Sequence, residues 1–255
     1  MTAYPAFRRG RALAVQGVPV LAIPRVSLPF SKHDIWQDTA GRAFRRIGEM
    51  YSLWNSRHLV QPDDDPQLFE LGATNRWFCQ YAWTRGLRFG VIAASDNHLG
   101  HPGANNSSIY VRHSGGLAGV LARTNAREPF WQSLTGRATY ATTGTQLYLE
   151  FASDGHVMGS EYQSTTPRRL TGRIAGTNRL ASVEVVRLTA GRYATIFSAI
   201  PDRETFAFDF VDTNVVAPAM YYLRVTHVEE YRGRLYSHST AEMTWSSPIW
   251  IDVPR

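Results

Sequence analysis

A short apolar segment followed by polar residues constrains this chain more than any other feature. Residues 89–94 form an apolar run bounded by glycine and polar residues, which is typical of a strand buried on both faces. Asp96 and His98 follow it, two positions apart. If the extended conformation continues past residue 94, both side chains project to the same side. The carboxyl end of a buried strand is where α/β proteins form active sites, so this segment predicts a functional site.

Two interpretations of this segment stay open. A carboxylate and an imidazole are both metal ligands, but two ligands alone do not make a metal site. The sequence Ser-Asp-Asn at residues 95–97 is also ordinary turn chemistry, in which the Asp96 side chain caps the backbone. His101 and His113 follow in polar sequence and add imidazoles, although each alone is typical of a solvated loop.

Further candidate ligands lie earlier in the chain. Residues 47–54 predict another strand, with Glu49 inside it. A carboxylate in an apolar strand needs a partner, which is a metal ion, an arginine or solvent at an edge. His58 follows this strand as a further imidazole. Residues 63–65 are three adjacent aspartates, a run that is more typical of a solvated loop than of a cation site.

Composition indicates a globular protein with a packed core. The chain has 255 residues, of which 44% are hydrophobic and 19% charged, and its formal net charge is +6. Its basic residues are nearly all arginines spread along the chain, so we expect small anionic ligands rather than nucleic acid. The single cysteine, Cys79, excludes an intramolecular disulfide and is expected in the core. No apolar run could span a membrane and no signal peptide is recognisable, so as read the chain is expected in the cytoplasm, away from membranes.

The periodicity of apolar residues changes near residue 144. Before it, helical spacing alternates with short apolar runs. The predicted helices cover 73–85 and the segment from Asn125, where Asn125 and Glu128 form a capping box, and the predicted strands include 18–23 and 117–122. After it, apolar and polar residues alternate strictly, as antiparallel strands require. The strand-like segments include 206–210, 221–225 and 249–253. We therefore expect an α/β unit over residues 1–144 and an antiparallel β-sandwich over residues 145–255.

Two motifs together resemble an uncharacterised bacterial family related to the PHP (polymerase and histidinol phosphatase) superfamily. Residues 92–103 read Ile-Ala-Ala-Ser-Asp-Asn-His-Leu-Gly-His-Pro-Gly, and residues 137–144 read Arg-Ala-Thr-Tyr-Ala-Thr-Thr-Gly. The Gly-Leu pair at 116–117 and the Trp-Ser-Ser-Pro-Ile-Trp segment at 245–250 follow in the order typical of that family. The resemblance extends over most of the chain.

This resemblance implies a distorted (β/α) barrel with two or three divalent metals, often zinc, manganese or iron. The metals activate water for the hydrolysis of phosphoesters or related esters. Asp96 and His98 match positions of metal ligands in that family, and His58 and Glu49 are weaker candidates. The implied substrate is a small ester or phosphoester.

The chain departs from the family pattern in its first half. No His-x-His motif occurs, although family members begin with one that supplies the first ligands. Residues 23–26 read Ile-Pro-Arg-Val where Ile-Pro-His-His is expected. A barrel typically takes about 250 residues, far more than residues 1–144 provide. We therefore expect only the C-terminal part of a PHP-like barrel, because the start was assigned downstream, the gene is truncated, or a second chain supplies the missing half.

Two functions follow as hypotheses. The first is a metal-dependent hydrolase, incomplete in this chain because the first ligands are missing, with no catalytic residue assigned. The second is a non-catalytic binding or interaction protein built on the partial barrel and the sandwich, whose open strand edges invite pairing. Four aromatic residues of the alternating strands would form a sugar-binding platform in that case, although packing in the core is the commoner role. They are Tyr221, Tyr222, Trp245 and Trp250.

Overall fold

The computed structural model of the chain describes residues 13, 16, 19–23, 45–52, 79–95, 100, 115–214, 217–232 and 239–254. Within these ranges the helices are α3 (Cys79–Thr84) and α4 (Arg127–Thr135). The strands are β1 (Ile47–Ser52), β2 (Gly90–Ala94), β3 (Leu117–Val120), β4 (Thr139–Thr142), β5 (Leu147–Ser153), β6 (His156–Val157), β7 (Glu161–Gln163), β8 (Arg168–Gly176), β9 (Leu180–Thr189), β10 (Arg192–Ala199), β11 (Thr205–Asp212), β12 (Ala219–Arg232), β13 (Ser239–Ser246) and β14 (Ile249–Asp252).

Most of these strands belong to two sheets. The larger sheet has the order β10-β9-β12-β13-β4-β3, with β14 paired to β12 and β7 paired to β14. The smaller sheet has the order β11-β8-β5-β6. Within the described residues, pairing in both sheets is antiparallel except between β14 and β7. A third sheet consists, in the same part of the chain, of the parallel pair β1 and β2.

Alternating side chains build the core between the two large sheets. On β5, Leu149 and Phe151 are fully buried, and the residues between them are partly exposed. On β11, three phenylalanines alternate with exposed residues and pack against the same core: Phe206, Phe208 and Phe210. This period of two is what a sheet with one solvated face requires. The predicted strands at 206–210 and 221–225 are confirmed, as is the strand that begins at residue 249.

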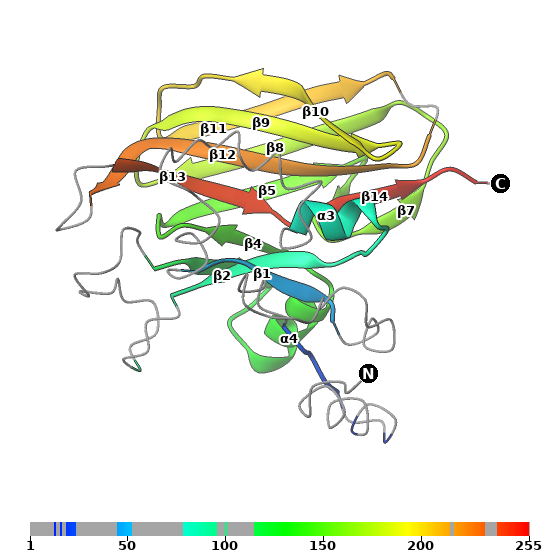
Figure 1. Cartoon of the computed structure of the whole chain (residues 1–255), viewed down its shortest axis with the longest axis horizontal. Helices are drawn as coiled ribbons and strands as arrows, with labels where there is room; N and C mark the ends of the chain where they lie inside the picture. The colour runs from blue at the N-terminus through cyan, green and yellow to red at the C-terminus, as the bar shows by residue number, and fades with distance from the viewer. Residues whose placement is uncertain are drawn as a thin grey trace.

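The opposite face of the larger sheet carries a second core. Val186, Tyr222 and Trp245 point to this side, where β1, β2 and α3 cover them. Trp83 of α3 donates its indole N–H to the backbone oxygen of Phe89 at 3.2 Å, and its ring centroid lies 5.6 Å from that of Tyr222. Figure 1 shows β1 and β2 beside β4, with α4 beyond them. A strand covered on both faces loses the period of two, and residues 219–225 of β12 are accordingly all buried.

The candidate sugar-binding aromatics lie in these cores. Tyr221, Tyr222, Trp245 and Trp250 are at most 5% exposed, so they pack the protein interior and form no surface platform. Cys79 is likewise buried in the second core, as predicted, and burial raises the pKa of its thiol.

The predicted (β/α) barrel is wrong, and the described part of the chain is mostly β-sheet. The described residues hold no closed ring of strands. β3, α4 and β4 follow one another in the order expected for a parallel crossover, yet β3 and β4 are antiparallel, and β4 joins the larger sheet through β13. The cause is the turn after α4, where Arg137 has a φ of 64° and the N–H of Ala138 donates to the oxygen of Ser133. This turn sends the chain back alongside β3.

Other local predictions have mixed outcomes. Residues 19–23 lack the predicted strand. α4 begins after Ala126 without a side-chain cap, so the capping box at Asn125 is wrong, and Glu128 instead accepts a hydrogen bond from the Gln132 amide at 3.1 Å. Sheet pairing crosses residue 144, because β4 pairs with β13. The division into units over 1–144 and 145–255 stays a prediction.

A histidine is buried on β12. His227 is 1% exposed, and its Nε2 lies 3.3 Å from the hydroxyl oxygen of Thr244. Its Nδ1 has no hydrogen-bond partner among the described residues. Burial disfavours the charged imidazolium and lowers the pKa of His227 to about 4.

We predict that acid destabilises the protein through His227. Below the ordinary histidine pKa of about 6.5 the unfolded chain takes up a proton, while the folded chain does so only near pH 4. The free energy of unfolding therefore falls between pH 6.5 and 4, by on the order of 3 kcal/mol from this residue. Urea unfolding of the wild type and of His227→Gln at several pH values measures the difference. If the free energy of unfolding falls by the same amount with decreasing pH in both proteins, the effect does not come from His227.

Candidate functional site

β1 and β2 are parallel neighbours, so both strands end at the same edge. Their register pairs Ile47 with Gly90 and Ser52 with Ala94, with a bulge between Glu49 and Tyr51. The oxygen of Ala94 accepts a hydrogen bond from the N–H of Gly116 at 3.2 Å, which brings the start of β3 to this edge as well. Carboxyl ends of parallel strands are where α/β structures bind ligands, so this edge is the candidate site.

One face of the β1–β2 pair points away from the core. Val91 and Ala93 are buried in the second core, so alternation places Ile92 on the opposite face of β2. Glu49 is the register partner of Ile92 and is half-buried. Side chains of residues paired in register lie on the same face, so the Glu49 carboxylate and the Ile92 side chain are neighbours.

The predicted ligands divide between the described and undescribed parts of the chain. Glu49 lies in β1, as predicted for a strand carboxylate. Asp96, His98 and His58 lie outside the described residues, as do His101, His113 and the aspartates at 63–65. No three His, Cys, Asp or Glu side chains gather closely enough to hold a metal ion within the ranges that the structure describes.

A groove of about 520 Å³ borders this face. Ile92 of β2 forms one wall, the side chains of β3 another, and α4 the third. Its lining is mostly apolar and consists of Ile92, Ala118, Val120, Ala122, Thr124, Asn125, Phe130 and Leu134. The volume lies within the range of about 300 to 1,000 Å³ that is typical of small-molecule sites.

The groove was not predicted from the sequence, although Asn125, which lines it, was singled out there. Phe130, Trp131 and Leu134 form an apolar stripe on α4, yet no residue of α4 is buried and Phe130 is 44% exposed. Asn125 was expected to cap the helix and lines the groove instead. The sequence shows the apolar stripe of α4, but it does not show which surface that stripe contacts.

The start of β2 is fixed to the larger sheet through Ser247. The Ser247 hydroxyl accepts a hydrogen bond from the N–H of Val91 at 2.9 Å and lies 3.0 Å from the hydroxyl of Thr139. A Cβ atom at Gly90 would lie 2.5 Å from the Ser247 hydroxyl oxygen and 2.8 Å from the Cβ of Arg137. Only glycine permits this approach, which sets the position of β2.

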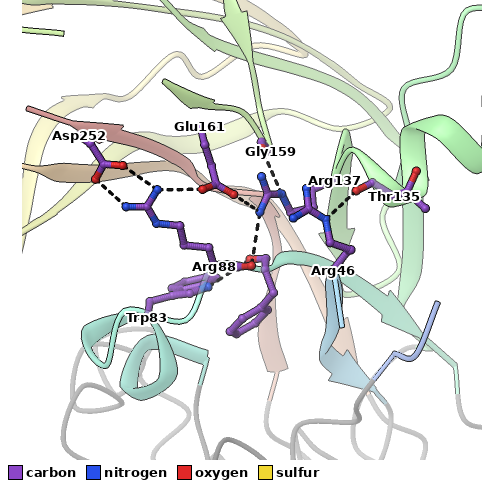
Figure 2. A network of polar contacts seen from close by, with 9 residues as sticks. Arg46, Trp83, Arg88, Thr135, Arg137, Gly159, Glu161 and Asp252 are labelled. Atoms are coloured by element: carbon purple, nitrogen blue, oxygen red, sulfur yellow. Dashed lines mark hydrogen bonds and ion pairs between the residues drawn. The ribbon is translucent and has the colours of Figure 1, made fainter. Parts of the chain in front are cut away.

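A network of ion pairs surrounds the same end of β2 (Figure 2). Arg88 binds both carboxylate oxygens of Asp252, at 2.6 and 2.9 Å, and binds Glu161 at 2.8 Å. Arg137 binds the other oxygen of Glu161 at 2.7 Å and donates to the carbonyl of Gly159 at 2.8 Å. Four segments distant in sequence are thereby joined: the chain before β2, the turn after α4, β7 and β14.

The protonation states of this network are set by burial and by the arginines. Burial opposes the charge on Glu161, but hydrogen bonds from Arg88 and Arg137 outweigh it and hold the pKa of Glu161 below its usual value. The hydrogen bond with Asp252 raises the pKa of Arg88, and burial lowers the pKa of Arg137. Glu161 and both arginines therefore stay charged at neutral pH, which suits a network that orders the chain.

Comparison with known proteins yields relatives without an assigned function. The profile of a family described as "Protein of unknown function (DUF3604)" matches residues 104–169. An uncharacterised protein of Chlamydia trachomatis is 27% identical over 231 residues, which cover 82% of this chain and 35% of that protein. Uncharacterised proteins of Chlamydia muridarum and Chlamydia pneumoniae are 26% and 28% identical over the same shares. The chain spans about a third of the length of the curated relatives that it matches.

These findings correct the identification suggested by the sequence motifs. The profile that matches is that of a family of unknown function, and the relatives are uncharacterised, so the assignment to the PHP superfamily is wrong.

Neither helix in the described part of the chain has the length and apolar character needed to cross a bilayer.

We predict that Arg137→Met destabilises the protein by about 2 to 4 kcal/mol. The guanidinium is 3% exposed, and its loss leaves the Gly159 carbonyl and one Glu161 oxygen without their donor. Its stacking on Trp250, at 4.7 Å from the ring centroid, is lost as well. Urea unfolding measures the effect.

Arg169→Met is the matched control for this prediction. Arg169 also pairs with a carboxylate, that of Asp209, but both side chains are exposed, and such pairs add little to stability. Equal losses of unfolding free energy in the two variants would show that the buried network stabilises the protein no more than an exposed ion pair does.

Proposed function

We propose that the chain is a metal-dependent hydrolase with its site at the carboxyl edge of β1 and β2. The reaction class is hydrolysis of a phosphoester or related ester by metal-activated water. The assigned ligands are Asp96 and His98, joined by Glu49 and His58. A small anionic substrate suits the formal net charge of +6.

The observation that supports this proposal is the parallel, in-register pairing of β1 with β2. Glu49 lies within β1, and Asp96 and His98 follow the last residue of β2 by two and four positions. Glu49 pairs with Ile92, four residues before Asp96, which corresponds to roughly 13 Å along an extended strand. The proposal therefore requires the chain to turn after Ala94, so that Asp96 and His98 approach Glu49 at this edge.

The proposed donors suit a divalent ion such as zinc, manganese or iron. Carboxylate oxygens and imidazole nitrogens are ligands that these ions share. When bound, such an ion lowers the pKa of water to about 7 and polarises the ester. The described ranges hold no group of three ligands, and three of the four proposed ligands, Asp96, His98 and His58, lie outside them. The described strands form no barrel, so a second chain that completes one is no longer part of the proposal.

A non-catalytic binding protein is the second candidate. The observation that favours it is the apolar groove beside α4, where Phe130 is 44% exposed. In this case the groove binds a ligand, and the sheets serve as its scaffold. Metal binding and hydrolysis distinguish the two candidates.

We predict that the purified chain binds about one divalent ion and that Asp96→Asn/His98→Gln abolishes binding. Isothermal titration with Mn²⁺ and Zn²⁺ measures the affinity. Glu49→Gln should weaken it by about tenfold or more. Hydrolysis of bis(4-nitrophenyl) phosphate and 4-nitrophenyl acetate should require the ion and be lost in the double variant.

Asp209→Asn is the matched control, because Asp209 is an exposed carboxylate on β11 that pairs with Arg169. It should bind metal like the wild type. A folded wild-type chain that binds neither ion would exclude the hydrolase and leave the binding protein.

A further inference from the structure

We draw no further inference here: the strongest candidate, the fully buried guanidinium of Arg168 at the start of β8, has an Nε without a hydrogen-bond partner among the described residues, but that atom is enclosed by the protein and adjoins no open space in which an anion could bind.

Discussion

The buried guanidinium of Arg137 is the contact on which the arrangement of the layers depends. It binds the carbonyl of Gly159 and the carboxylate of Glu161, and it lies over the ring of Trp250. Its backbone adopts a left-handed conformation, which costs a residue with a side chain roughly 1 kcal/mol. The same conformation turns the chain from α4 into β4. Arg137 thus lies both in the turn that leads into β4 and in the ion-pair network beside the start of β2.

The larger sheet differs from that of a simple sandwich because both of its faces are covered. The smaller sheet packs on one face, and β1, β2 and α3 pack on the other. Residues such as Tyr221 and Tyr222, which are adjacent in β12, therefore lie in different cores. The groove lies outside this frame, where the outer face of β2 meets β3 and α4.

The periodicity of apolar residues predicted several strands correctly, but it did not predict how the strands pair into sheets. Alternation located β11 and β12, and the apolar run at 89–94 located β2, because these signals depend on neighbouring residues alone. The barrel was wrong because the order β3, α4, β4 does not determine strand direction, which the turn at Arg137 sets. Glu49 was correctly placed in a strand. The groove was missed because it depends on which surface α4 leaves uncovered, a property of packing between distant segments.

The pairing of β4 with β13 has a consequence for folding during synthesis. Thr143, at the end of β4, exchanges backbone and side-chain hydrogen bonds with Met243, 100 residues further along the chain. Until the ribosome has translated β13, the edge of β4 that pairs with β13 has no neighbour, and an unpaired edge exposes a strand to association with other chains. Contacts of such high sequence separation also slow folding. This part of the larger sheet therefore cannot close before β13 has been synthesised.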